Sequence, residues 1–163
     1  MIEPGQELPD ATLFESTEFG EACPLSPRKI SVAEAARGKT IVIFGLPGAY
    51  TPTCSAQHVP GYVKHLDALR AKGVDEVWCV SVNDGYVMAA WGRDQDAMGK
   101  IRFLGDGSGE LTQKLGLDVT IPGMGMRMKR ASLLVVDGVV KAVHVEAPGK
   151  FEVSNAETML RSL

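Results

Sequence analysis

The sequence predicts an α/β fold in which a mixed central sheet is flanked by helices on both faces. Two observations predict it. Apolar segments rich in β-branched residues alternate with segments of helical periodicity through residues 39–98. After them, two more apolar segments flank Asp137-Gly138, a strong signal for a tight turn between antiparallel strands. Alternating elements favour parallel strands and a hairpin adds antiparallel ones, so the sheet should be mixed.

The elements of the alternating part can be placed by their boundaries. Ser31 and Glu34 have the spacing of a capping box, so a short helix should precede the first strand. Residues 39–46 and 74–82 are continuous apolar runs, as expected of strands buried on both faces. A helix should follow each strand, because apolar residues recur there at helical spacing. After the first strand they are Val59, Tyr62, Val63, Leu66 and Leu69, and after the second they are Val87, Ala90, Trp91 and Met98.

The last third of the chain adds a strand, a hairpin and a helix. Residues 101–104 indicate a third strand, and residues 132–136 and 139–145 indicate the two strands of the hairpin. Ser154 and Glu157 again have capping-box spacing, so a helix should finish the chain. The thioredoxin fold has this order of elements.

Length and composition favour a single domain over residues 1–163 and a small neutral substrate. The chain has 163 residues, 45% of them hydrophobic, which is enough to bury a continuous core. Its 17 Lys and Arg against 20 Asp and Glu give a net charge of -3, which argues against nucleic acid or an anionic membrane surface as partner. The first residues are acidic and Pro-rich, unlike a secretory signal, and no apolar run is long enough to cross a bilayer, so we expect a cytoplasmic protein.

The cysteines narrow the chemistry. Cys23, Cys54 and Cys79 are too few, and odd in number, for a disulfide framework, and no two of them form a CxxC pair. Burial or reactivity is therefore the expected role of each.

The segment after the first strand gives Cys54 a chemically special place. Residues 47–54 read PGAYTPTC, a turn that leads into a helix. If Thr51 is the N-cap, Pro52 takes the first helical position and Cys54 lies in the first turn. Unpaired backbone N–H groups and the positive end of the helix dipole favour a thiolate there. On these residues alone, Thr51 could be only a cap and Cys54 only a small packed residue.

The whole segment, continued by SAQHVPGYV, resembles the PxxxTxxC active-site motif of the peroxiredoxins, particularly the type II or peroxiredoxin-5 subfamily. Residues 81–92, 129–140 and 151–154 are similar to that subfamily in order and spacing, so the resemblance covers nearly the entire chain. It implies a thioredoxin fold and reduction of hydrogen peroxide and alkyl hydroperoxides without a cofactor. It also implies catalytic roles for Pro47, Thr51, Cys54 and an arginine near the start of the hairpin.

Two arginines compete for that last role. Arg127 and Arg130 both precede the strand that begins near residue 132. The family pattern places Arg130 in the site and leaves Arg127 in reserve. Alternatively, Arg127, Lys129 and Arg130 could be an ordinary solvated basic run.

The expected chemistry divides among these residues. Cys54 should attack the terminal peroxide oxygen and become a sulfenic acid. The Thr51 hydroxyl, the Cys54 N–H and the Arg130 guanidinium are candidates to stabilise charge on the departing oxygen. Pro47, which has no N–H, should shield the thiolate from water, and Gly48 should let the backbone approach the substrate.

His58 stands one helical turn after Cys54, where its side chain could tune or orient the site. A metal pair of Cys54 and His58 has little support, because no other Cys or His has ligand-like spacing nearby, so we expect no metal. His65 and His144 should be surface or packed residues.

No resolving cysteine is expected within the chain. Two-cysteine relatives in the subfamily carry one near residues 151–156, and this chain has none there. Cys79 lies in the apolar segment EVWCVSV and should be buried. Cys23 lies in the Pro-rich segment EACPLSPRK and is a minority candidate, which could act only if that loop reaches Cys54.

The resemblance also suggests partners. The tail FEVSNAETML is similar to the peroxiredoxin domain of bacterial peroxiredoxin-glutaredoxin hybrids, which suggests a one-cysteine mechanism with glutathione or a separate glutaredoxin as reductant. Thioredoxin is an alternative donor. The family further suggests a homodimer.

Two other functions remain open at this point. A cysteine hydrolase could use Cys54 as nucleophile and His58 as base, although no third residue is evident to orient His58. A thioredoxin-like binding module without catalysis would carry Cys54 as an ordinary thiol.

Overall fold

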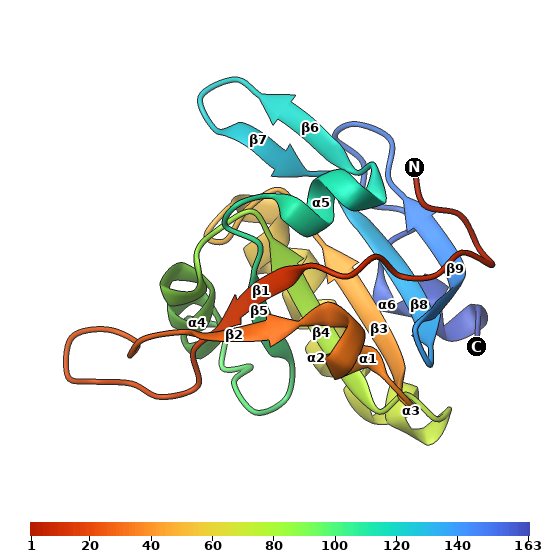
Figure 1. Cartoon of the computed structure of the whole chain (residues 1–163), viewed down its shortest axis with the longest axis horizontal. Coiled ribbons are helices and arrows are strands. Elements are labelled where there is room, and N and C mark those ends of the chain that lie inside the picture. Colours follow the sequence, from red (N-terminus) through yellow and green to blue (C-terminus); the bar gives the residue numbers. More distant parts are fainter.

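A seven-stranded mixed sheet forms the centre of the molecule in the computed structural model, which describes all residues 1–163 (Figure 1). Its strand order is β2-β1-β5-β4-β3-β8-β9, and β6 and β7 form a separate two-stranded sheet. Strands β3, β4 and β5 are parallel, whereas β8 is antiparallel to β3. The strands are β1 (Thr12–Glu15), β2 (Arg28–Ser31), β3 (Thr40–Gly45), β4 (Glu76–Ser81), β5 (Arg102–Gly105), β6 (Asp118–Ile121), β7 (Gly125–Met128), β8 (Ala131–Val136) and β9 (Val139–Val145).

Helices cover both faces of this sheet, as the sequence predicts (Figure 1). Helices α1 and α5 pack on one face, and α2, α3, α4 and α6 pack on the other. The helices are α1 (Val32–Ala36), α2 (Val59–Lys64), α3 (Leu66–Ala71), α4 (Gly85–Asp94), α5 (Glu110–Leu115) and α6 (Ala156–Arg161), and the π-helical segment η1 (Cys54–His58) leads into α2.

Strand β3 shows why the central strands have no polar face. Ile41 and Ile43 point into the core under α1 and α5, and Val42 and Phe44 point into the core under α2, α4 and α6. All four are fully buried. Burial on both faces explains the continuous apolar run in the sequence.

The predicted hairpin is present, and its turn has the expected backbone conformation. Asp137 and Gly138 both have positive φ, 46° and 79°, as a two-residue turn between twisted strands requires. Strands β8 and β9 flank this turn and pair antiparallel. The hairpin matters for function because Arg130 lies directly before β8.

The two predicted caps have different outcomes. Ser31 caps α1 by accepting a hydrogen bond from the Glu34 N–H. The cap of α6 is Asn155, which accepts from the Thr158 N–H, so the prediction that used Ser154 was displaced by one residue. Ser154 lies one residue before this cap, and its hydroxyl donates to the Glu146 carboxylate.

Three features were not predicted: the β1–β2 pair, the six-residue helix α5 and the β6–β7 hairpin. The helix after the first strand is also divided. It begins at residue 52, widens into η1, and changes from α2 to α3 at His65. Cys54 therefore sits in a segment whose turns are wider than those of an α-helix.

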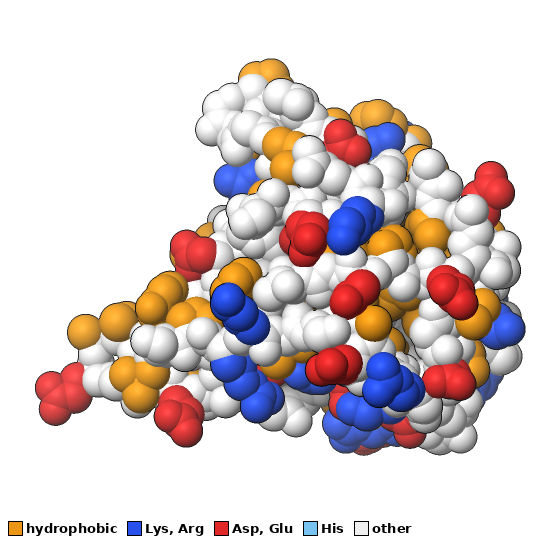
Figure 2. All heavy atoms as spheres, in the orientation of Figure 1, with side chains coloured by type: hydrophobic (Ala, Val, Ile, Leu, Met, Phe, Trp, Pro, Cys, Tyr) orange, Lys and Arg blue, Asp and Glu red, His pale blue; other side chains and the backbone are white.

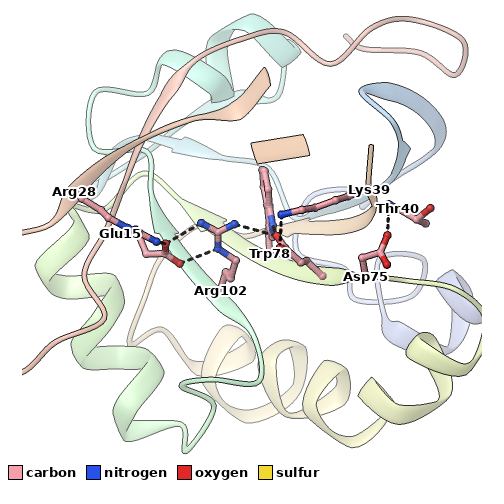
Figure 3. Close-up of polar contacts among 8 residues, drawn as sticks. Glu15, Arg28, Lys39, Thr40, Asp75, Trp78 and Arg102 are labelled. Atoms are coloured by element: carbon pink, nitrogen blue, oxygen red, sulfur yellow. Dashed lines mark hydrogen bonds and ion pairs between the residues drawn. The ribbon is translucent and has the colours of Figure 1, made fainter. Parts of the chain in front are cut away.

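A partly exposed ion network, in which only Glu15 is buried, connects the strands at the end of the sheet away from Cys54 (Figure 3). The Arg102 guanidinium donates to Glu15 at 2.9 Å and 3.0 Å, and to Glu76 at 3.0 Å. Lys39 pairs with Glu76 at 2.8 Å, and Arg28 with Glu15 at 3.4 Å. The network links β1, β4 and β5, so it stabilises the sheet rather than the reactive loop.

Residues 16–27 form an arm between β1 and β2 that projects from the body of the molecule (Figure 1). On the face shown in Figure 2, apolar side chains lie along this arm, and acidic and basic side chains are interspersed over the body. No helix has the length and apolar character needed to span a bilayer.

Candidate active site

The reactive segment lies where β3 ends and the helical run begins. Ser55 N–H donates to the Thr51 carbonyl at 2.9 Å, which is the first backbone bond of that run, so Pro52 takes the first helical position as predicted. The Thr51 hydroxyl does not cap the helix. It donates instead to the Gly48 carbonyl at 2.7 Å and closes the loop that precedes the cysteine.

Cys54 and Arg130 are in direct contact. The Arg130 Nη2 donates to the Cys54 Sγ at 3.1 Å, and Cys54 is fully buried. A guanidinium is always charged and can only donate, so the sulfur is the acceptor in this contact and the positive charge stabilises negative charge on it. Arg130 is therefore part of the site and not of a solvated basic run.

His58 is held between Arg130 and the backbone of Ser154. The Arg130 Nη1 lies 3.0 Å from His58 Nδ1, and His58 Nε2 lies 3.1 Å from the Ser154 carbonyl. Because arginine only donates, Nδ1 must be the acceptor and Nε2 must carry the proton. Burial and the positive charge of Arg130 lower the pKa of His58 to about 3, so the ring is neutral at physiological pH.

Aromatic rings surround His58 and its hydrogen-bond partners. Phe44 stacks on Tyr62 with ring centroids 4.2 Å apart, and the Tyr62 hydroxyl donates to the Ser154 carbonyl at 2.9 Å. Phe151 meets the His58 ring edge-on at 5.1 Å and lies 5.9 Å from the Arg130 guanidinium carbon. These rings keep water away from the polar contacts, which strengthens each of them.

Arg127 has a different place from Arg130. Its Nη1 donates to the Pro47 and Val82 carbonyls, both at 3.3 Å, and its Nε donates to the Met124 carbonyl at 3.1 Å. A Cβ on Gly48 would lie 3.1 Å from this guanidinium, so the missing side chain lets Arg127 lie against the loop. Arg127 thus holds the loop backbone, whereas Arg130 contacts the thiol.

Strand β4 also holds the loop. Asn83, which follows it, accepts a hydrogen bond from the Ala49 N–H at 3.0 Å and another from the Ser81 hydroxyl at 2.7 Å. The half-buried Pro47 offers no N–H to this region. The Cys54 N–H donates no hydrogen bond to a carbonyl of the preceding loop, as expected in a first helical turn. This donor is free for a ligand at Sγ.

The other two cysteines differ in exposure. Cys23 is exposed on the projecting arm, and Cys79 is fully buried in β4 beside Phe44. Burial, together with the nearby Cys54, raises the pKa of the Cys79 thiol, so it stays protonated at neutral pH. Cys79 is therefore a weak nucleophile.

The remaining histidines lie outside the site. His65 pairs with Glu157 at 2.9 Å, and His144 with the Ser162 hydroxyl at 2.9 Å. No three His, Cys, Asp or Glu side chains gather in a group that could hold a metal ion.

The sequence pattern did not single out Glu146. This buried carboxylate follows β9 and accepts hydrogen bonds from Glu152, Val153 and Ser154. One acidic residue between a strand and a Pro-Gly turn is a common surface pattern, so no local signal identifies it. Tyr62 was expected only as a core residue of the helix.

The chain matches the family model described as Redoxin over residues 3–160. Among curated proteins it is 43% identical to peroxiredoxin-2B of Arabidopsis thaliana over 161 residues, which cover 98% of this chain and 96% of the relative. It is 44% identical to peroxiredoxin-2C of Oryza sativa subsp. japonica over 163 residues, with 98% and 96% covered.

The solved structures similar to this chain also include peroxiredoxins. A Burkholderia cenocepacia protein described as a putative thioredoxin reductase has a TM-score of 0.94 and 55% identity, covering 100% of this chain and 98% of that one. Reduced Prx3 of Vibrio vulnificus in complex with H2O2 has a TM-score of 0.90 and 44% identity, with 99% of each chain covered. Peroxiredoxin 5 of Alvinella pompejana has a TM-score of 0.84 and 28% identity, with 99% and 97% covered.

Proposed function

Because the chain belongs to the redoxin family and is a peroxiredoxin, a thiol peroxidase, we propose that Cys54 is its peroxidatic nucleophile and that an external thiol completes the cycle. The observation that carries this proposal is the 3.1 Å contact between the Arg130 guanidinium and the Cys54 sulfur at the start of a helical run. Hydrogen peroxide is a proposed substrate, and the similar Vibrio vulnificus protein with bound H2O2 supports it.

The proposed first step forms one S–O bond and breaks one O–O bond. The Cys54 thiolate attacks the terminal oxygen of the hydroperoxide, and the other oxygen leaves as an alkoxide or hydroxide that takes up a proton. Arg130 donates to the sulfur and the Cys54 N–H is free, so both would stabilise the charge on the departing oxygen. The Thr51 hydroxyl would join them only by giving up its bond to the Gly48 carbonyl. The products are a Cys54 sulfenic acid and water or an alcohol.

The second step needs a thiol from outside the chain. Cys79 is buried and protonated, and Cys23 lies on the projecting arm, so neither is favoured as the resolving group. Glutathione would condense with the sulfenic acid to give a mixed disulfide and water. A second glutathione, or a glutaredoxin, would then release the Cys54 thiol. Because Cys54 is fully buried, the η1 segment must open for this exchange.

The geometry argues against a cysteine hydrolase. Both nitrogens of His58 are engaged, and its pKa of about 3 makes it a poor proton acceptor at neutral pH. The chain also has no CxxC pair, the dithiol expected of a thioredoxin-type disulfide reductase. A binding module without catalysis would not need the buried contact between Arg130 and the thiol.

We also propose that the protein is located in the reducing cytoplasm. We further propose that it forms a homodimer. Tyr50 and Tyr86 are 54% and 45% exposed, and both lie near the reactive edge of the sheet, in the loop after β3 and at the start of α4. Exposed aromatic residues are enriched in protein interfaces. Sedimentation velocity over a range of concentrations should show a dimer, and Tyr86→Glu should weaken it. A monomer at every concentration would contradict the proposal.

Mass spectrometry after one equivalent of hydrogen peroxide tests the one-cysteine cycle. Without glutathione we expect a trappable sulfenic acid on Cys54, and with glutathione a mixed disulfide at the same residue. Glutaredoxin should then increase peroxide turnover. Cys23→Ser and Cys79→Ser are the matched controls and should keep full turnover. A disulfide from Cys54 to either Cys23 or Cys79 would overturn the one-cysteine cycle.

A further inference from the structure

A chain of hydrogen bonds runs from a buried carboxylate to the reactive thiol. It begins at Glu146, which is 7% exposed and follows strand β9. The Glu146 N–H donates to the Arg130 carbonyl at 2.9 Å, so the two residues face each other across the base of the hairpin. The carboxylate itself turns toward the loop of residues 147–155 that connects β9 to α6.

The Glu146 carboxylate fixes the backbone of this loop. It accepts from the Glu152 N–H at 2.9 Å, the Val153 N–H at 2.8 Å, the Ser154 N–H at 2.7 Å and the Ser154 hydroxyl at 2.7 Å. Burial raises the pKa of Glu146, but these donors outweigh burial and leave it below the ordinary value. The group is therefore an ionised carboxylate without a Lys or Arg partner, and hydrogen-bond donors of the loop stabilise its charge.

The fixed loop presents the Ser154 carbonyl to the site. This oxygen accepts from His58 Nε2 at 3.1 Å and from the Tyr62 hydroxyl at 2.9 Å. An acceptor at this point forces the proton of His58 onto Nε2, which leaves the lone pair of Nδ1 facing Arg130. Arg130 Nη1 donates to that lone pair, and its Nη2 is thereby directed at the Cys54 sulfur.

We propose that Glu146 is a positioning residue, which sets the orientation of Arg130 at Cys54 through the Ser154 carbonyl and the tautomer of His58. The inference rests on the proposed role of Cys54 as nucleophile. Without the carboxylate, the Ser154 carbonyl loses its fixed position, the His58 Nε2–H loses its fixed acceptor, and only Arg130 still favours this tautomer. The His58 ring can then turn, and Arg130 loses one of its two buried acceptors. The guanidinium then spends less time on the sulfur, so it stabilises negative charge there less well.

Glu146→Gln tests the proposal, because the amide is nearly the same size but cannot accept from all four donors. The rate of peroxide reduction should fall about tenfold or more at neutral pH, as expected of a misplaced catalytic donor. Alkylation of Cys54 by iodoacetamide should slow as well, with its pH profile moved to higher pH and its high-pH plateau kept. Glu157→Gln removes the same charge at an exposed position, so it should leave both rates within about twofold of wild type, as is usual for surface substitutions.

A double-mutant cycle separates positioning from a general loss of structure. If Glu146 acts through Arg130, Glu146→Gln should change the alkylation rate by less than about twofold in an Arg130→Lys background. Equal effects in both backgrounds would overturn the proposal, and so would an unchanged pH profile in Glu146→Gln. Because alkylation involves no peroxide, the cycle still decides this point if wild type fails to reduce peroxide, which would refute the proposed function instead.

Ser154→Ala covers the case in which Glu146→Gln does not fold. It removes one donor to Glu146 and keeps the carbonyl that holds His58. Alkylation should slow by about twofold to threefold, in keeping with the loss of one hydrogen bond of several, and the effect should vanish in Arg130→Lys. A wild-type profile in Ser154→Ala, or an effect that persists in Arg130→Lys, would count against the proposal.

Discussion

Arg130 contacts two buried acceptors with one planar guanidinium, the Cys54 sulfur and His58 Nδ1. A lysine at this position is a point charge and cannot span both acceptors with the same geometry. Arg127 contacts backbone carbonyls of the loop and not the sulfur. Replacement of Arg130 should therefore lower the rate of peroxide reduction more than replacement of Arg127.

Arg130→Lys should lower the second-order rate constant for hydrogen peroxide by about a hundredfold, the usual effect of losing one preorganised donor. Arg127→Lys should lower it by less than about tenfold, because a lysine can still donate to one carbonyl. Stopped-flow measurement of peroxide consumption compares the two. Equal losses would contradict the different roles assigned to these arginines.

His58 links the site to pH-dependent stability. In the unfolded chain its pKa is near 6.5, whereas burial and Arg130 lower it to about 3 in the folded protein. Between these values only the unfolded chain binds the proton. The free energy of unfolding should therefore fall as the pH drops below 6.5, by at most about 1.4 kcal/mol per pH unit from this residue.

Urea unfolding at a series of pH values measures this slope. His58→Asn, which has no titratable ring, should be less stable near pH 7 but should lose stability less steeply between about pH 6.5 and pH 5. The other two histidines are present in both proteins and cancel in the comparison. Parallel curves for His58→Asn and wild type would show that His58 is not held neutral.

Elements with strong local signals could be predicted from the sequence. The hairpin at Asp137-Gly138, the continuous apolar strands and the Ser31 cap depend on neighbours in the chain, and all three are present. Strands β1 and β2 are four residues each and separated by the arm, so only their pairing with each other and with β5 defines them. Helix α5 has six residues between two glycines with φ of 70°, too short for a periodic pattern.

The β6–β7 hairpin had a weak signal that was not used. Val119 and Ile121 alternate with polar residues before the turn at Pro122-Gly123, which is typical of a half-exposed strand. Its position over the loop through Arg127 depends on tertiary packing, and the same is true of Glu146 beside residues 152–154. The reactive motif, Arg130 and His58 could be predicted from sequence, whereas Glu146 and the β6–β7 hairpin could not.

The cap of α6 gives a prediction at the scale of one element. Asn155 accepts from the Thr158 N–H at 3.0 Å and begins the helix that packs in the same core layer as Tyr62. Asn155→Ala should lower the free energy of unfolding by about 1 kcal/mol, the usual effect of losing an N-cap. Urea denaturation measures it, with Asn155→Ser as the control that should retain most of the stability. A loss of the same size in Asn155→Ser would argue against a capping role.

At the scale of the whole molecule, the ion network and the reactive cysteine lie at opposite ends of the sheet. The ion network (Figure 3) lies near the start of β4. Because β3 and β4 are parallel, this is the other end of the sheet from Cys54, which follows β3. The two core layers on either side of the sheet connect these ends. Changes in the network should therefore affect unfolding more than peroxide reduction.

Arg102→Met should destabilise the fold by about 3 kcal/mol, because it leaves the buried Glu15 carboxylate without its main partner. Arg28→Met is the matched control. Its side chain is 68% exposed, and the change should cost less than about 1 kcal/mol. Urea unfolding measures both, and the peroxide rate of the folded proteins should stay close to wild type. A small loss in Arg102→Met would show that the network contributes little to stability.

The most direct test of the account is the site of oxygen transfer after a single equivalent of hydrogen peroxide. Peptide mass spectrometry with a sulfenic acid trap should locate one added oxygen on Cys54, and Cys54→Ser should neither gain this oxygen nor consume peroxide. Oxygen found first on Cys23 or Cys79, or peroxide turnover retained in Cys54→Ser, would contradict the assignment of Cys54 as the peroxidatic nucleophile.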